Sequence, residues 1–188
     1  MNELKLYMLL LGCKPPGRNT EQHDVFFGIA QNLKDLLPAI TSFWPDANGK
    51  VHLDAWRELT QVGDYDVRVE TKDSTKATAA SGAKLFFINL GGYKPGEFEE
   101  FHYKMIMACK DKGEAISEAK RSAFYKHTGF AGAGSHVDDK YGVDVDDLYE
   151  IADILPPEIK EQYSIILTER VEVRNDSLQL GYIMLNKL

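Results

Sequence analysis

The chain has 188 residues, of which 44% are hydrophobic and 27% charged, an ordinary balance for one globular domain or two small halves. Its formal net charge of −7 argues against binding to a nucleic-acid backbone, which requires a basic face. No apolar run approaches the length of a membrane span, no secretory signal is visible, and the two cysteines suggest no disulfide framework. The sequence therefore predicts a cytoplasmic protein that binds neither nucleic acid nor membrane.

The first predicted elements are a strand, a loop and a helix. Residues 4–11 form a nearly continuous apolar run that Gly12 ends, as is typical of a strand covered on both faces. Prolines and glycines in residues 12–19 exclude a helix there. Apolar residues at helical spacing then predict a helix that begins at Glu21 and that Pro38 ends.

The remainder of the first half is predicted to contain strands. Residues 39–44 and 51–59 are expected to be two strands joined by a turn. Alternation with a period of two predicts a further strand over residues 65–70. Residues 73–82 are rich in Ser, Thr, Ala, Lys and Gly, which indicates a linker.

The second half is predicted to repeat this order. It opens with a strand over residues 84–90 and a helix over residues 98–112. Residues 114–126 fit a helix by periodicity, or a strand by analogy with the first half. Residues 163–173 and 178–185 are predicted to form a final hairpin.

The segment from Lys5 to His23 recurs from Lys84 to His102 without a gap. Eight of nineteen positions are identical, where roughly one identity is expected by chance. The identical residues Lys5, Leu6, Leu11, Gly12, Pro16, Gly17, Glu21 and His23 match Lys84, Leu85, Leu90, Gly91, Pro95, Gly96, Glu100 and His102. The sequence thus indicates an internal duplication.

From this duplication we expect an α+β fold with mostly antiparallel sheets and pseudo-twofold symmetry. Each copy would be a β-α-β-β unit, with one more strand where the sequence allows it. The predicted boundaries are a first repeat over residues 1–72, a linker over 73–82 and a second repeat over 83–188. The two repeats are expected to pack together as one globular unit.

Several short motifs carry a family resemblance. They are Leu-Gly-x-x-x-Pro-Gly, then Glu21-x-His23-Asp24, Ser42-Phe-Trp-Pro45 and His52-x-Asp54. This pattern resembles a bacterial family catalogued as domain of unknown function 1543, which carries one or two copies of such a domain per chain. The resemblance covers most of residues 4–170 and implies no activity. The second copy departs from it, with Tyr103 in place of Asp24 and Glu97 in place of Arg18.

Each half retains two histidines and one aspartate that could bind a metal ion. They are His23, His52 and Asp54 in the first half, and His102, His136 and Asp138 in the second. Residues two apart in a strand point the same way, so His52 and Asp54 could converge, with His23 completing the set. Two imidazoles and a carboxylate suit Fe, Mn or Zn, which predicts about one or two such ions per chain. Glu21 is left out, because a helix would rotate it about 200° from His23. The alternative is that these side chains only satisfy buried polar groups between elements.

The loop containing Lys14, Arg18 and Asn19 suggests a second kind of site. A cationic loop that opens onto a helix N-terminus is suited to a carboxylate or phosphate. Its glycine spacing matches neither the P-loop nor the dinucleotide fingerprint. A tight Pro-Gly turn with solvated charges is the alternative.

Two classes of function are open at this point. The first is a non-enzymatic module that binds a small molecule or a protein partner, self-association included. The second is a small metal-dependent enzyme that uses the His/His/Asp set of one or both repeats. The sequence names no substrate.

Overall fold

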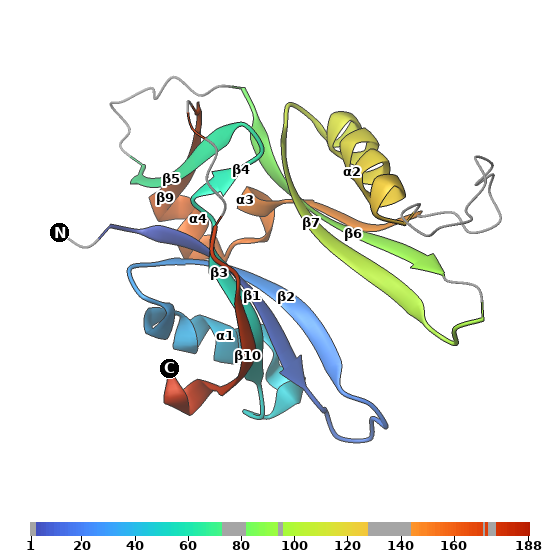
Figure 1. Cartoon of the computed structure of the whole chain (residues 1–188). Helices are drawn as coiled ribbons and strands as arrows, with labels where there is room; N and C mark the ends of the chain where they lie inside the picture. Colours follow the sequence, from blue (N-terminus) through green and yellow to red (C-terminus); the bar gives the residue numbers. More distant parts are fainter. Residues whose placement is uncertain (1–2, 73–81, 94–95, 128–143, 171, 173–175) are drawn as a thin grey trace. The chain divides into compact units, whose positions relative to one another are not determined.

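The computed structural model describes residues 3–72, 82–93, 96–127, 144–170, 172 and 176–188. The chain divides into two compact units (Figure 1). Unit 1 comprises Met1–Ala80 and Ile154–Leu188, and unit 2 comprises Ser81–Asp153. The predicted second repeat, residues 83–188, therefore extends over both units. The predicted positions His136 and Asp138 lie outside the described residues.

Among the described residues, unit 1 contains a four-stranded antiparallel sheet in the order β10-β3-β1-β2 (Figure 1). The strands are β1 (Lys5–Cys13), β2 (Gln22–Ala30), β3 (His52–Glu58) and β10 (Gln179–Met184). A second described sheet of this unit has the order β4-β5-β9, with β4 (Gln61–Val62), β5 (Tyr65–Thr71) and β9 (Tyr163–Glu169). Strand β1 lies between β3 and β2 in the larger sheet, so it pairs with a neighbouring strand on each side.

The core of unit 1 lies between the larger sheet and a short helical segment. This segment is α1 (Leu37–Phe43), preceded by a 3₁₀ turn over Leu33–Leu36 and followed by another over Pro45–Ala47. Leu9 and Leu11 of β1 and Ile40 of α1 are fully buried in one apolar cluster. One face of the sheet is thus filled by apolar packing. The remaining short helices are α3 (Ile151–Ile154), α4 (Pro157–Gln162) and the 3₁₀ turn Leu185–Lys187.

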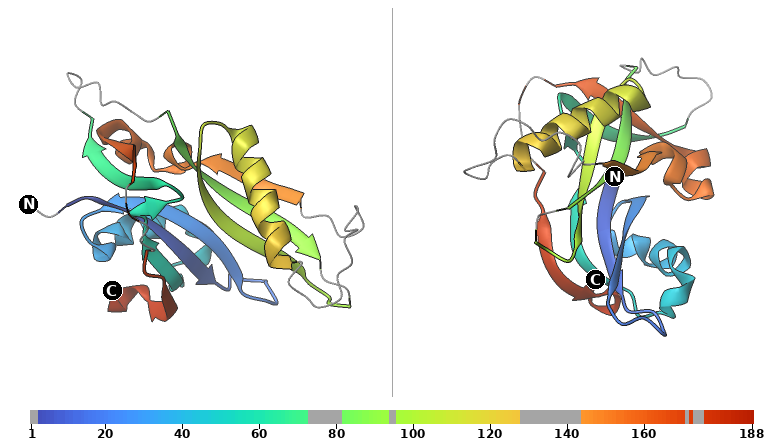
Figure 2. Two further views of the ribbon diagram at one scale, coloured as in Figure 1. Left: turned by 45° about the horizontal axis from the view of Figure 1, so that its top comes forward. Right: turned by 90° about the vertical axis from the view of Figure 1, so that its right-hand side faces the viewer.

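Unit 2 is built from a described three-stranded sheet in the order β7-β6-β8 and one long helix. The elements are β6 (Lys84–Tyr93), β7 (Glu100–Cys109), α2 (Lys112–His127) and β8 (Asp144–Glu150). Figure 2 shows α2 lying across the sheet, where the buried Ala115 and Ala119 pack against Phe86, Ile88 and Leu90. The helix thus covers one face of the sheet.

The predicted α+β class with mainly antiparallel sheets is confirmed. Two predicted helices were wrong, since the helix from Glu21 is strand β2 and the helix over 98–112 is largely strand β7. The last six residues of β2 are all buried, so the strand needs apolar residues on both faces. Phe26, Ile29 and Ala30, which fitted a helical period, lie within that continuous run.

Two more predicted elements were wrong, and one alternative that the sequence left open is decided. The predicted strand 39–44 was wrong, because Leu37–Phe43 is α1 and Pro38 stands in its first turn, where proline is tolerated. Residues 114–126 lie within α2, so the helical alternative is confirmed. The predicted final hairpin was wrong, since β9 pairs with β5 and β10 pairs with β3. No described helix is both long and apolar enough to span a lipid bilayer.

Candidate metal centre

Gly12, in the central strand β1 of unit 1, organises the candidate site. Its cross-strand neighbour on β2 is His23, and its neighbour on β3 is His52. Residues directly opposite one another in a sheet project on the same face. The strand register alone therefore brings the two histidines to either side of one glycine.

Asp54 reaches the same place through a break in the ladder. Leu10 pairs with Ala55 and Leu11 pairs with Leu53, which leaves Asp54 as an extra residue in β3. A bulge of this kind bends the strand and redirects the side chain of the extra residue. The carboxylate of Asp54 lies between the histidines, with Oδ1 3.3 Å from His52 Nε2 and Oδ2 3.2 Å from His23 Nε2.

Glu21 completes the cluster from the residue before β2. Its Oε1 lies 3.0 Å from His52 Nε2 and its Oε2 lies 3.9 Å from His23 Nε2. The sequence-based argument excluded Glu21 because it assumed a helix. In extended chain, residues two apart point the same way, so Glu21 and His23 converge. Imidazoles and carboxylates consequently alternate around a closed ring of four contacts.

The absence of a side chain at Gly12 makes room for this ring. A Cβ atom at that position would overlap His52 Nε2 and would lie 2.5 Å from Asp54 Oδ2. Real Cβ atoms essentially never show contacts this short. The side chains of His52 and Asp54 therefore stand directly over the glycine backbone.

The ring is buried on one side and open on the other. His52 is 6% exposed, and its ring lies against that of Tyr182, with centroids 4.4 Å apart. The side chains of Glu21 and His23 are 46% and 42% exposed. Asp54 Oδ2 is buried, and although His23 Nε2 lies 3.2 Å away, no hydrogen bond to this oxygen is formed among the described residues. A buried carboxylate oxygen without a hydrogen bond is costly, which favours a cation at this point.

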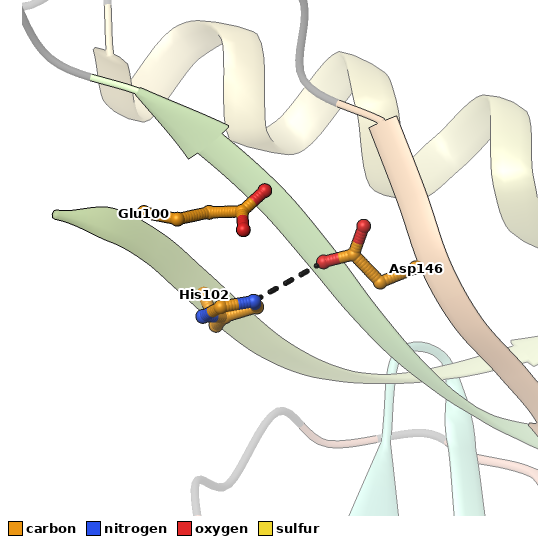
Figure 3. A group of neighbouring side chains, drawn as sticks. All are labelled: Glu100, His102 and Asp146. Carbon is orange, nitrogen blue, oxygen red and sulfur yellow. Dashed lines mark ion pairs between the residues drawn. The ribbon is translucent and has the colours of Figure 1, made fainter.

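Unit 2 has a corresponding arrangement around Gly91. Gly91 pairs with His102 on β7 and with Asp144 on β8, and the ladder break between Asn89 and Leu90 leaves Asp146 as the extra residue. His102 Nε2 lies 3.3 Å from Asp146 Oδ2. One ligand atom from each of Glu100, His102 and Asp146 lies within 4.8 Å of the others (Figure 3).

This register replaces the predicted match of His136-Val-Asp138 with His52-Leu-Asp54. In the strand ladders the residues that occupy the corresponding places are Asp144, Val145 and Asp146. Glu100 could have been found from the sequence, since it is one of the identities in the repeat. Asp146 could not, because the spacing between the matched segments differs in the two halves.

The predicted anion-binding residues Lys14, Arg18 and Asn19 lie in the exposed loop between β1 and β2. The backbone N–H of Arg18 donates to the carbonyl of Pro15 at 3.3 Å, and Gly17 has a φ of 78°, which glycine readily adopts. The loop leads into a strand, so the helix dipole assumed by the hypothesis is absent. Anion binding here stays a prediction that depends only on charge.

Neither cysteine has the environment of a nucleophile. Cys13 and Cys109 are free and buried. Burial, followed by the charge of Glu21, raises the pKa of the Cys13 thiol. Burial, with smaller effects from acidic neighbours that include Glu114, raises the pKa of Cys109 to about 11. Both thiols are therefore protonated near neutral pH, and a thiolate is the reactive form.

We expect Cys109 to react with a soluble thiol reagent at pH 8 far more slowly in the folded protein than in denaturant. A thiol with a pKa of about 11 is roughly 0.1% thiolate at that pH, and its burial limits access further. In a Cys13→Ala variant Cys109 is the remaining cysteine, so the measured rate of thiol modification belongs to it. Equal rates in buffer and in denaturant would contradict the described burial.

Comparison with known proteins locates the first cluster within a family match. Residues 18–69 match the family Domain of Unknown Function, DUF1543. That span contains the whole ring of Glu21, His23, His52 and Asp54. The DUF1543 match covers the region of unit 1 from the β1–β2 loop to β5.

A solved structure supports the fold of the whole chain. The crystal structure of protein Il1583 from Idiomarina loihiensis is similar, with a TM-score of 0.58 and 20% sequence identity. The similarity covers 96% of this chain and 96% of that one. No curated protein matches the sequence. The similarity to Il1583 concerns the fold alone.

Proposed function

We propose that the protein is a binding module in which unit 1 holds one divalent transition-metal ion. Glu21, His23, His52 and Asp54 would be the ligands, and the ion would be Fe, Mn or Zn. The observation that carries this proposal is the convergence of two imidazoles and two carboxylates over Gly12, with Asp54 Oδ2 buried and without a hydrogen bond.

A hydrogen-bonded cluster without metal explains this geometry less well. Each Nε2 atom carries at most one hydrogen, yet His52 Nε2 lies 3.0 Å from Glu21 and 3.3 Å from Asp54. Donors that share an ion with bonds near 2.1 Å lie about 3.0 to 3.4 Å apart. Three of the four contacts in the ring fall within 3.0–3.3 Å. A shared ion would account for these three contacts.

The donor set narrows the class of ion. Imidazole nitrogen suits Zn and Fe, and carboxylate oxygen suits Mn, so a mixed set fits borderline divalent ions. An octahedral ion held by four side chains would retain two further positions. The exposed sides of Glu21 and His23 would leave these positions open to solvent.

This open side favours a second candidate function, a small metal-dependent enzyme. Catalytic ions need a position that water or substrate can occupy. Tyr182 lies against His52 and is 65% exposed, so an aromatic surface borders the proposed ion. A substrate that bound the ion could also contact this ring.

We infer further that the two units are copies of one β-β-α-β unit. In support, Gly12 and Gly91 occupy the same place in their sheets, and each third strand has its ladder break beside an aspartate. An ion pair also recurs, with Lys5 2.8 Å from Glu58 and Lys84 2.8 Å from Glu150. The two lysines and the two glycines belong to the sequence identities, whereas the ladder breaks and the partners Glu58 and Glu150 lie outside them.

The metal content of the untagged protein tests the first proposal. After expression in medium supplied with Fe, Mn and Zn, elemental analysis should find near-stoichiometric metal that depends on unit 1. Asp54→Asn should lose that metal, because the change weakens a ligand with little change in shape. Asp24→Asn is the matched control, since Asp24 is the next residue after His23 and lies outside the ring.

His52→Ala gives a second reading of the same site. It should remove the contribution of unit 1 to the rise in melting temperature that the metal produces in the wild-type protein, because only an intact site couples binding to folding. A wild-type protein that contains no metal and shows no thermal shift with Fe, Mn or Zn would refute the proposal. Equal metal in Asp54→Asn and Asp24→Asn would refute the assignment of ligands.

A further inference from the structure

We propose that unit 2 carries a separate cation site, made by Glu100, His102 and Asp146, that prefers Mn²⁺ more strongly than unit 1 does. The preference is defined as the affinity for Mn²⁺ relative to Zn²⁺. The comparison rests on the proposed function of unit 1, but the existence of the second site does not.

The three side chains converge over Gly91. A Cβ atom there would overlap Asp146 Oδ2 and would lie 2.9 Å from Glu100 Oε1. His102 Nε2 lies 3.3 Å from Asp146 Oδ2. Figure 3 shows Glu100 and His102 projecting from β7 toward Asp146 on β8, across the central strand. Both flanking strands thus deliver ligand-type atoms above one glycine, as in unit 1.

Oxygen makes up a larger share of the donor set in unit 2. The strand position that His52 occupies beside Gly12 is occupied beside Gly91 by Asp144. The described cluster of unit 2 therefore has one imidazole and two carboxylates, where unit 1 has two of each. Carboxylate oxygen suits Mn²⁺, Mg²⁺ and Ca²⁺, whereas imidazole nitrogen suits Zn²⁺ and Fe.

The second site is also more accessible to water. Glu100, His102 and Asp146 are all exposed, whereas His52 of unit 1 is 6% exposed. Ions that prefer oxygen ligands commonly keep several waters and bind through few protein groups. An exposed set of three side chains is compatible with such partly hydrated binding. We therefore expect the ion to bind more weakly and to exchange faster at unit 2 than at unit 1.

Titration of full-length protein with Mn²⁺ tests the existence of the site. In His52→Ala, which lacks a ligand of unit 1, electron paramagnetic resonance of free Mn²⁺ should show about one bound ion. Adding Asp146→Asn should remove it. Adding Asp147→Asn should not, because Asp147 accepts a hydrogen bond from Asn89 and lies outside the cluster. His23→Ala, at an exposed position, replaces His52→Ala if the latter fails to fold.

Competition between Mn²⁺ and Zn²⁺ tests the preference. The ratio of the Mn²⁺ to the Zn²⁺ dissociation constant should be at least about tenfold smaller in His52→Ala than in Asp146→Asn, which retains only the site of unit 1.

The outcomes separate the two proposals. Mn²⁺ binding by His52→Ala, with neither Mn²⁺ nor Zn²⁺ bound by Asp146→Asn, would support the second site and refute the first. The reverse pattern would refute the second site and leave the first. A bound Mn²⁺ that Asp146→Asn does not displace, or a ratio of dissociation constants that is equal in His52→Ala and Asp146→Asn, would overturn the proposal.

Discussion

Gly12→Ala is expected to abolish metal binding by unit 1. The added Cβ would overlap His52 Nε2 and stand 2.5 Å from Asp54 Oδ2, in the space between the donors. His52 is buried against Tyr182 and has little room to withdraw. Alanine is compatible with the strand backbone, because Gly12 is not among the described residues with positive φ. Gly12→Ala should therefore lose metal binding while the metal-free protein keeps most of its folding stability.

The measurements are metal content and the thermal shift produced by Zn²⁺, which should both fall to the level contributed by unit 2. Gly91→Ala is the matched variant, because its Cβ would overlap Asp146 Oδ2 of unit 2 and leave the first ring untouched. Circular dichroism checks that both variants fold. Full retention of the metal by Gly12→Ala would show that the ion, if any, lies elsewhere.

The strands of unit 1 show why local periodicity was an unreliable guide. Residues 25–30 of β2 are buried throughout, so hydrophobicity has no period of two. Any continuous apolar run also contains positions at helical spacing, and the loop before it supplied a plausible helix cap. A buried strand differs from a helix in that both of its faces are covered, and this covering depends on segments distant in the sequence.

The residues of the first site were predicted with partial success for the same reason. His52 and Asp54 lie in a segment predicted correctly as a strand, and the structure brings them together with His23. Glu21 was excluded because the wrong helix would have turned it away. The wrongly predicted helix thus removed Glu21 from the predicted set of ligands.

The second site required information that a single sequence does not hold. The match of His52 with His136 followed residue identity, whereas the strand register matches His52 with Asp144. The ladder break that leaves Asp146 unpaired arises from pairing with β6, many residues away. Sequence similarity located the glycine and the first histidine of each copy, whereas Asp146 was located only by strand pairing.

Leu9→Ala should be the most destabilising single change in the core of unit 1. Leu9 is fully buried against the α1 segment, where it packs in the same cluster as Ile40. Truncating a buried leucine costs about 2–5 kcal/mol, because the transfer free energy is lost and a cavity remains. Denaturant unfolding followed by circular dichroism measures this change, and Ile88→Ala gives the corresponding change in the core of unit 2.

Metal should restore much of that loss, because the site and the core share strand β1. A ligand present at a hundredfold excess over its dissociation constant stabilises the folded state by about 2.7 kcal/mol. Leu9→Ala with saturating Zn²⁺ should therefore approach the stability of metal-free wild-type protein. Leu9→Ala combined with His52→Ala should gain nothing from the first site. An equal gain in the double variant would mean that the ion stabilises the protein without binding the ring over Gly12.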